Sequence, residues 1–483
     1  MSRYLTTTLP YLNGDPHLGH ALEFVQADFL ARALRAQGEE VYLNIGTDEH
    51  GAKVAEKAKE AGEEIHAYVD RYAKRFKDFA DRLEISYDSF IRTTDPAHMK
   101  AAQEFWKRCL VAGDIYQAKY EVRYCVGCEL EKTDSELVGG RCPLHPNLEI
   151  EIRTEKNYYF KFSRYQQTLM ELFAKEPEFV VPKKRFHEIV TFVKNGLKDF
   201  SISRPKEKLA WGVPVPDDDT QVMYVWFDAL VNYVSAVGWP SDEEKFKKWW
   251  PVVQLAGKDQ VRQQAGIWQG MLASAGLPFS KQIFIHGFIN ISGEKMSKSI
   301  GNVIDPLKIA EQYGVDVLRY FLLRHVNPTE DTDIGEATIH EAYTTHLTNG
   351  LGNLVARVMT LAEQNLPHAI ELTDEDERVD EAFYEKVEAY RFNEAMDLIF
   401  EQIGAADVYM NERAPYKKIK SGDAVEREAA RRDIEQLVHV LAKIAAHLIP
   451  AMPRTAAAIA AAVRKNQKPK NLFPRIDKHA GEL

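Results

Sequence analysis

The chain has 483 residues, of which 45% are hydrophobic and 28% are charged, and its net charge at pH 7 is -10. This length exceeds one ordinary domain and predicts two to four units, while the negative charge argues against general binding of polyanions outside a local basic face. Because no run of eighteen apolar residues occurs and the first residues lead into a predicted strand rather than a signal peptide, we expect a cytoplasmic protein without membrane segments.

The first predicted elements are a strand over residues 4–9, a proline-bounded turn, and a helix that begins near His17 and His20. Strand, loop and helix in this order form the basic unit of nucleotide-binding α/β folds. Peptide N–H groups and the helix dipole favour an anion at a helix start, so the two imidazoles are suited to a phosphate. In isolation the pair could equally be surface or capping histidines.

A second strand is predicted over residues 41–46, and it ends in a polar turn that contains Asp48. Ligands of open α/β sheets bind beyond the carboxyl ends of the strands, which makes Asp48 a candidate for holding an ammonium group. The alternative is that Asp48 caps the following helix, which is a common use of aspartate.

Between about residues 115 and 220 the alternation of strands and helices stops, and a metal-binding pattern appears. It contains three of the four cysteines of the chain and one histidine: Cys125, Cys128, Cys142 and His145. Two closely spaced pairs separated by a loop can bring four ligands to the tetrahedral geometry of a structural zinc. Four protein ligands leave no open position, so the metal would hold the fold rather than react. A disulfide is the weaker alternative in a cytosolic protein.

The alternation resumes at an apolar strand predicted over residues 222–228, and further strands are predicted over residues 252–256 and 282–286. Gly257 and Asp259 follow the middle one of these strands, where a glycine and a carboxylate could hold ribose hydroxyls. As with Asp48, the alternative for Asp259 is a helix cap.

A lysine-rich loop follows these strands and contains Lys295 and Lys298 beside two serines. Mobile ammonium groups flanked by small residues suit a leaving pyrophosphate, whose charge must be met as the bond breaks. A solvated basic loop is the alternative. If this lysine loop folds back toward the two histidines, the pair of segments encloses a nucleoside triphosphate.

From about residue 336 the composition becomes helical and rich in alanine. The fold prediction is therefore α/β: a Rossmann-type doubly wound parallel sheet with an inserted zinc-knuckle domain and a C-terminal all-α helical bundle. The expected boundaries are 1–114 and 221–286 for the two halves of the catalytic domain, 115–220 for the insertion, 287–343 for the lysine loop and stem-contact region, and 344–483 for the helical domain.

The motifs together resemble the class I aminoacyl-tRNA synthetases, and in their details the methionyl-tRNA synthetase family. The supporting segments occur in order from residue 4 to the C-terminal region, at residues 9–14, 17–20, 124–129, 211–216, 224–229, 295–299, 353–357 and 472–476. The resemblance implies ATP-dependent ligation of L-methionine to tRNA(Met) through methionyl-adenylate, for translation initiation and elongation, with Mg-ATP as a substrate and one structural zinc.

The resemblance also implies roles for individual residues. The catalytic set is His17, Gly19, His20, Lys295 and Lys298. ATP is bound by His17, His20, Gly257, Asp259 and Lys298. The amino acid is bound by Leu9, Tyr11, Asp48, Trp226, Ala229 and Tyr233. The anticodon is read by Asn353, Arg357 and Tyr416, where Tyr416 stands in place of the family's tryptophan and still offers a stacking face.

The sequence departs from the family pattern after Asp259, where Gln260 replaces an apolar residue and Gln263 and Gln264 replace a Phe-His pair beside the methionine side chain. Unpaired amides at an apolar pocket wall are costly. Either the glutamines pair with each other or with tyrosines, or the amino-acid specificity differs, or the helix is rotated and they face solvent.

Two other functions therefore remain open alongside methionine ligation. One is a class I synthetase with altered amino-acid specificity, and the other is a tRNA-binding paralogue with reduced catalysis. Because no additional C-terminal module follows the helical region, we expect a monomer.

Overall fold

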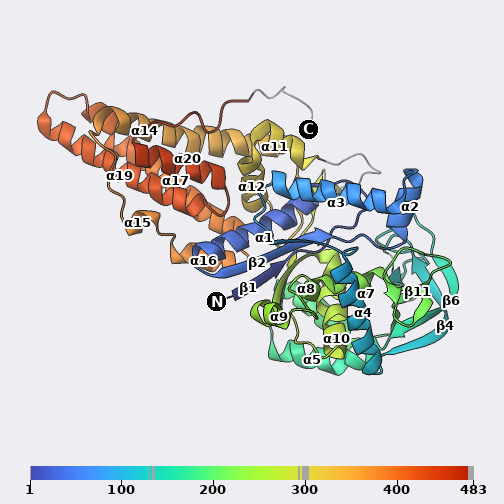
Figure 1. Cartoon of the computed structure of the whole chain (residues 1–483). Helices are drawn as coiled ribbons and strands as arrows, with labels where there is room; N and C mark the ends of the chain where they lie inside the picture. Colours follow the sequence, from blue (N-terminus) through green and yellow to red (C-terminus); the bar gives the residue numbers. More distant parts are fainter. Residues whose placement is uncertain (1, 129, 133–135, 292–293, 296–303, 477–483) are drawn as a thin grey trace.

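The computed structural model describes residues 2–128, 130–132, 136–291, 294–295 and 304–476 (Figure 1). Its centre is a six-stranded parallel sheet in the order β3-β2-β1-β12-β13-β7. The strands are β1 (Ser2–Thr6), β2 (Glu40–Thr47), β3 (Ser89–Arg92), β7 (Val180–Val181), β12 (Val252–Gly257) and β13 (Gln282–His286). The sheet confirms the predicted fold class, and its middle is the junction of β1 and β12, two strands far apart in the sequence.

Helix α1 (Leu18–Ala36) is the central helix of the molecule. Its apolar residues, including Leu22, Val25 and Phe29, are buried because the sheet covers one side and C-terminal helices cover the other (Figure 1). The other helices of the first half are α2 (Ala52–Glu60), α3 (Ile65–Arg82) and α4 (Pro96–Val111). Helix α1 is thus held between the sheet and the C-terminal helices.

The insertion is built on two small antiparallel sheets. One has the order β5-β4-β6-β8, from β4 (Ile115–Cys125), β5 (Leu130–Glu131), β6 (Glu151–Phe160) and β8 (Phe200–Ser201). The other has the order β10-β11-β9, from β9 (Ser203–Pro205), β10 (Pro214–Val215) and β11 (Asp218–Met223). Two helices, α5 (Gln166–Lys175) and α6 (Lys183–Lys194), lie between β6 and β8 in the sequence.

The strand predicted over residues 222–228 is wrong in two respects. Strand β11 ends at Met223 and belongs to the small antiparallel sheet, and residues Val225–Leu230 form helix α7. The next helices are α8 (Asn232–Ser235) and α9 (Glu243–Trp249). A short apolar run does not distinguish a buried strand from a buried helix, which explains the error.

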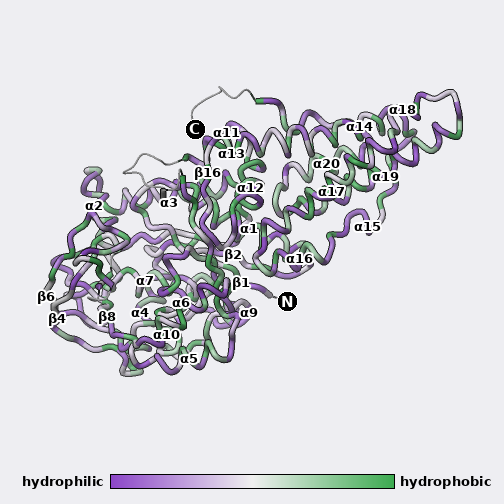
Figure 2. Tube along the Cα trace, turned by 180° about the vertical axis from the view of Figure 1, so that it is seen from behind, coloured by the Kyte–Doolittle hydropathy of each residue, from purple (hydrophilic) through white to green (hydrophobic). Residues whose placement is uncertain are grey.

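After β13 the chain forms a third small sheet from β14 (Ile289–Ile291), β15 (Glu294–Lys295) and β16 (Thr332–Ile334). The helical region that follows confirms the expected all-α unit. Its main helices are α13 (Glu336–Ala342), α14 (Asn353–Asn365), α16 (Glu381–Glu388), α17 (Phe392–Arg413), α19 (Ala424–Leu448) and α20 (Pro453–Lys465), while α11 (Pro306–Tyr313) and α12 (Val315–Arg324) lie between β15 and β16. Within the described residues no helix is apolar over a length that would cross a bilayer, and in Figure 2 the longest helices mix polar and hydrophobic residues.

The helical region and the sheet share one core. Arg319 of α12 is fully buried, pairs with Asp28 of α1 at 2.7 Å, and donates to the backbone carbonyls of Pro450 and Ala451 before α20. At the C-terminal end, Phe473 packs against Gly352. Because breaking a buried ion pair is costly, this junction holds the two regions in a fixed relation.

Candidate active site

The two histidines of the motif lie at the start of α1 and cap it. Nδ1 of His17 accepts a hydrogen bond from the backbone N–H of Gly19 at 3.1 Å, and Nδ1 of His20 accepts from the backbone N–H of His17 at 3.2 Å. The rings stack with centroids 3.8 Å apart. Because both Nδ1 atoms accept, the neutral rings carry their protons on Nε2, so the pair offers two N–H donors beside the helix N-terminus.

Gly19 permits this stacking. A Cβ atom at Gly19 would lie 3.0 Å from Cε1 of His17, so a larger residue would push the ring out of place. Capping and anion binding are therefore compatible here, and the two interpretations of the histidines do not exclude each other.

A buried carboxylate one turn into α1 ties three elements together. Glu23 accepts from the backbone N–H and the hydroxyl of Thr8, both at 2.6 Å, and lies 2.9 Å from Nε2 of His286 at the end of β13. Burial lowers the pKa of His286, but the hydrogen bond and charge of Glu23 outweigh burial and raise that pKa overall. Our sequence analysis missed Glu23, although a charged residue within the apolar stripe of α1 was a usable signal.

Gly257 and Asp259 lie together at the carboxyl end of β12, beside β1. A Cβ at Gly257 would lie 3.0 Å from Oδ1 of Asp259 and 3.6 Å from the ring of His286. The carboxylate therefore turns back over the glycine. Gly257, not Asp259, is the N-cap of the short helix that follows, and no side-chain cap is formed, so the capping alternative for Asp259 is wrong.

Asp48 follows β2 and lies beside the loop after β1. Its backbone N–H donates to the carbonyl of Pro10 at 2.9 Å, and its carbonyl accepts from Leu12 at 3.2 Å. Tyr11, between them, pairs with Asp48 in a parallel bridge. The N-cap of α2 is Gly51, so the capping alternative for Asp48 is also wrong.

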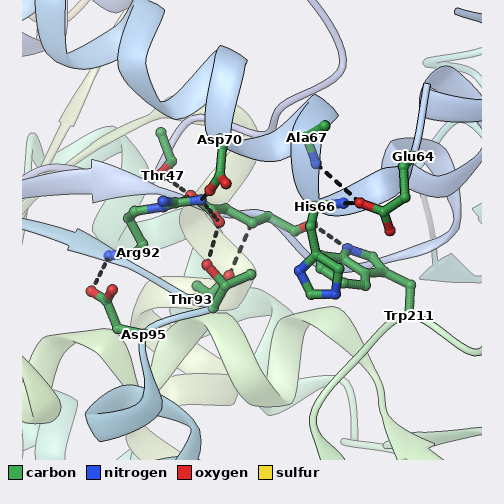
Figure 3. Close-up of polar contacts among 11 residues, drawn as sticks. Thr47, Glu64, His66, Ala67, Asp70, Arg92, Thr93, Asp95 and Trp211 are labelled. Carbon is green, nitrogen blue, oxygen red and sulfur yellow. Dashed lines mark hydrogen bonds and ion pairs between the residues drawn. The ribbon is translucent and has the colours of Figure 1, made fainter.

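The loop that carries Asp48 is held by its neighbour Glu49, which is fully buried. Arg92 of β3 contacts both carboxylate oxygens of Glu49, at 2.7 and 2.9 Å, and the indole N–H of Trp211 donates to the Glu49 carbonyl at 2.6 Å. Figure 3 shows Arg92 and Trp211 reaching this loop from different elements. A two-point arginine contact fixes orientation as well as position, so the loop is rigid.

Asp228 is another buried carboxylate, between Trp226 and Ala229 in sequence. Its two oxygens contact Nδ1 of His50 at 2.6 Å and Nε2 of His98 at 2.8 Å. Burial raises the pKa of Asp228, but the two histidines outweigh it and lower that pKa to about 2. The contacts fasten α7, and with it the half-buried Trp226, to the loop after β2.

Of the three glutamines that depart from the family pattern, Gln260 is half-buried, and Gln263 and Gln264 are buried. Gln263 is 5% exposed and Gln264 is 1% exposed, so the solvent-facing alternative is wrong. Gln264 does not pair with Gln263. Its Oε1 accepts from Nε2 of Gln254 in β12 at 2.5 Å. Burial raises the pKa of the Tyr233 hydroxyl, and hydrogen bonding with the Gln264 amide offsets part of that rise.

The cysteine cluster converges as predicted. The ligand atoms of Cys125, Cys128, Cys142 and His145 all lie within 4.8 Å of one another. The sulfur atoms of Cys128 and Cys142 are 3.4 Å apart, too far for a disulfide, and all four cysteines are free thiols. A Cβ at Gly127 would lie 2.3 Å from the ring of His145, so glycine is required there. Three soft sulfur donors and one imidazole fit a tetrahedral metal site.

A pocket of about 560 Å³ lies in the helical region. It is lined by Ala356, Arg357, Thr360, Leu361, Met410, Tyr416 and Lys468. The structure thus brings Arg357 and Tyr416 together, whereas Asn353 is exposed one turn earlier on α14 and is not part of the lining. Arg357 also pairs with Asp407 at 2.7 Å.

The lysine loop is only partly covered by the structure. The backbone of Lys295 lies in β15, which pairs with β14 next to the end of β13. Lys298 lies in residues 296–303, outside the described residues.

Comparison with known proteins places this geometry in a class. The family model described as "tRNA synthetases class I (M)" matches residues 3–150 and 145–359. The methionine--tRNA ligase of Thermosynechococcus vestitus is 38% identical over 92% of this chain and 87% of its own length, and that of Mesorhizobium japonicum is 39% identical over 92% and 89%. A solved Mycobacterium tuberculosis methionyl-tRNA synthetase in complex with methionyl-adenylate is 35% identical, with a TM-score of 0.90 over 99% of both chains.

The class is therefore that of the class I tRNA synthetases. Within this class, the chain belongs to the methionine--tRNA ligase family.

Proposed function

We propose that this chain ligates L-methionine to tRNA(Met) in two steps, for use in the cytoplasm. The methionine carboxylate attacks the α-phosphate of ATP, which forms methionyl-adenylate and breaks the bond to pyrophosphate. The terminal ribose hydroxyl of the tRNA then takes the methionyl group and releases AMP. The observation that carries this proposal is the stacked imidazole pair at the start of α1, in a fold that matches an adenylate-bound relative over its whole length.

At the ATP end, Nε2 of His17 and His20 donates to phosphate oxygens, and Gly19 keeps the two rings stacked. Gly257 and Asp259 hold the ribose hydroxyls. Lys295 and Lys298 meet the charge that develops on pyrophosphate. Because these groups are cationic or hydrogen-bond donors placed around developing charge, the rate gain comes from positioning and electrostatics rather than covalent catalysis.

At the amino-acid end, the carboxylate of Asp48 and the backbone of Leu9 hold the substrate ammonium group. Support comes from the rigid loop after β2 and its bridge to Tyr11. The side chain is enclosed by Tyr11, Trp226, Ala229 and Tyr233, with Gln263 and Gln264 at the wall. Aromatic rings suit a flexible thioether.

The cysteine cluster holds one structural zinc through Cys125, Cys128, Cys142 and His145. When bound, the ion organises the knuckle, which Lys53 of α2 joins to the catalytic unit by donating to the carbonyl of Gly127 at 2.6 Å. One zinc per chain is expected by elemental analysis, and Cys128→Ser should lose it. Zinc-free protein with an intact knuckle would contradict the assignment.

At the tRNA end, Asn353, Arg357 and Tyr416 read the anticodon. The chain acts as a monomer. Support comes from the pocket beside Tyr416, which can receive an unstacked base against the phenol ring. Arg357 can exchange its partly exposed carboxylate partner for a base edge or phosphate.

The buried glutamines favour a second candidate, a class I synthetase with altered amino-acid specificity. ATP–pyrophosphate exchange with each of the twenty amino acids separates the candidates, followed by aminoacylation of tRNA(Met). We expect exchange with methionine alone and charging of tRNA(Met). Exchange with another amino acid supports altered specificity, and no exchange with any of them supports a tRNA-binding paralogue.

A further inference from the structure

Lys258 lies between Gly257 and Asp259, the two residues proposed to hold the ribose, and its side chain extends to a distant part of the sequence. Its Nζ lies 2.5 Å from Oδ2 of Asp331, in the loop before β16, and 4.6 Å from the centre of the Phe288 ring. The two side chains of this ion pair are 27% and 36% exposed. A cation held by a carboxylate and an aromatic face has a defined position, so Lys258 is not a freely solvated lysine.

The carboxylate of Asp331 is fixed from two sides. Its Oδ2 contacts Lys258, and its Oδ1 accepts from the backbone N–H of Phe288 at 3.0 Å. Burial raises the pKa of Asp331, but the hydrogen bonds from Lys258 and Phe288 outweigh burial and lower that pKa overall. Asp331 is therefore charged at neutral pH, and it cannot turn without losing one of these two contacts.

The loop that carries Asp331 lies against the segment between β13 and β14. The backbone N–H of Thr332 donates to the carbonyl of Phe288 at 2.9 Å. The Phe288 ring in turn packs against Gly257, where it lies 3.4 Å from the position that a Cβ atom would take. One network of contacts thus runs from the ribose end of β12 to the backbone before β14.

The same network reaches the small sheet that carries the start of the lysine loop. Asp331 directly precedes β16, which pairs in parallel with β14. Strand β14 also pairs with β15, where Asn290 lies opposite Lys295. Through Asp331, Lys258 therefore joins the end of β12 to the sheet in which the backbone of Lys295 lies.

We propose that the ion pair of Lys258 and Asp331 sets the distance between the ribose site at the end of β12 and the small sheet of β14, β15 and β16. The two residues act through the groups at those places, so they are positioning residues. Attack at the α-phosphate requires the ribose and the pyrophosphate to be held at one spacing, so loss of the pair slows adenylate formation without weakening methionine binding. The inference rests on the proposed function and adds two residues to it.

Two substitutions remove the ion pair from opposite ends. Lys258→Met keeps an unbranched side chain without its charge, and Asp331→Asn keeps an oxygen for the Phe288 N–H while it presents an N–H group to Lys258. We expect each to lower the single-turnover rate of methionyl-adenylate formation roughly tenfold at saturating ATP, with the Kd for methionine unchanged. The double variant should be no slower than either single variant, because the same contact is lost in all three.

The comparison of the two variants separates positioning from a direct contact of Lys258 with ATP. If the ammonium group bound a phosphate itself, Lys258→Met would slow the reaction, whereas Asp331→Asn, which frees the ammonium group, would not. That outcome overturns the proposal. Lys258→Arg keeps a cation within reach of Asp331 and should be faster than Lys258→Met, and an equally slow arginine variant would contradict the role of the charge.

The matched control is Lys184→Met, which removes an exposed ion pair with Glu330, the neighbour of Asp331, at 3.0 Å. This pair joins the loop to α6 rather than to the end of β12, so the rate should stay unchanged. A merely structural role of Lys258 would lower the melting temperature and the active fraction found by active-site titration, without changing the rate per active site.

The failure of this inference is distinguishable from the failure of the proposed function. Unchanged rates per active site in both Lys258→Met and Asp331→Asn overturn the inference alone. Wild-type protein that forms no methionyl-adenylate overturns the proposed function and this inference with it.

Discussion

The catalytic end, where ATP and the amino acid are expected to bind, and the tRNA end treat charge in opposite ways. At the catalytic end, the carboxylates of Glu23, Glu49 and Asp228 are buried and paired with histidine or arginine. At the tRNA end, the ion pair of Arg357 and Asp407 is 33% and 46% exposed. Buried pairs are costly to break and fix geometry, whereas exposed pairs are weak and easily exchanged. The catalytic end is thus preorganised, and the tRNA end can trade protein contacts for contacts with a nucleic acid.

The substitution with the largest expected effect on the contrast between buried and exposed ion pairs is Asp228→Asn. Replacing the carboxylate leaves His50 and His98 without their buried charge partner, so the free energy of unfolding should fall by about 3–5 kcal/mol. Urea unfolding at pH 7 measures it. A loss below about 1 kcal/mol would place Asp228 with the exposed pairs instead.

The pH dependence of the unfolding free energy also tests the contribution of the buried Asp228 carboxylate. Because the folded pKa of Asp228 is about 2 and lies below its unfolded value, its contribution is present above pH 4 and is lost as the pH falls through 2. The full contribution is about 2 kcal/mol, and roughly half of it is lost by pH 3. Wild type should therefore lose more stability than Asp228→Asn between pH 7 and pH 3. Parallel acid profiles would contradict the assignment.

Lys298→Ala tests the catalytic end from the side of the lysine loop. The ammonium group is expected to meet charge that develops only in the transition state, so adenylate formation should slow by about 100- to 1000-fold with little change in methionine binding. Single-turnover kinetics and equilibrium methionine titration measure the two quantities. Equal losses in both would show that Lys298 supports binding generally.

Tyr416→Ala tests the tRNA end. Loss of a stacking face should raise the KM for tRNA(Met) by the equivalent of about 1–3 kcal/mol, while ATP–pyrophosphate exchange stays unchanged. Tyr416→Trp keeps a stacking face and serves as the matched variant. A fall in exchange for Tyr416→Ala would mean that the two ends are not independent.

The smallest effect is expected for Lys74→Ala, which removes an exposed pair with Asp78 on α3. The change in unfolding free energy should stay below about 0.5 kcal/mol. This variant sets the scale against which Asp228→Asn is judged, and a comparable loss in both would remove the contrast between buried and exposed pairs.

The sequence predicted the features that are local. The histidine pair, Asp48, Gly257 and the cysteine cluster each lie in a short segment with a recognisable turn or spacing, and the structure places each beside its expected element. The sheet class followed from the alternation of strands and helices. The strand expected over residues 222–228 failed because an apolar run of that length fits either element.

The contacts that orient the site could not be predicted. Glu23 meets His286 because β13 pairs with β12 beside β1, and Gln254 meets Gln264 because the turn after β12 folds back against that strand. No spacing in the sequence encodes such a meeting. The glutamines were flagged as a departure from the family, but their burial and their partner required coordinates.

The central claim is that the imidazole pair of α1 and the lysine loop act on one ATP. A double-mutant cycle with His20→Asn and Lys298→Ala, measured as the single-turnover rate of adenylate formation, tests it directly. We expect a coupling energy of about 1 kcal/mol or more, because both groups stabilise the same transition state. Additive effects within about 0.5 kcal/mol would mean that the two segments act independently, and would contradict it.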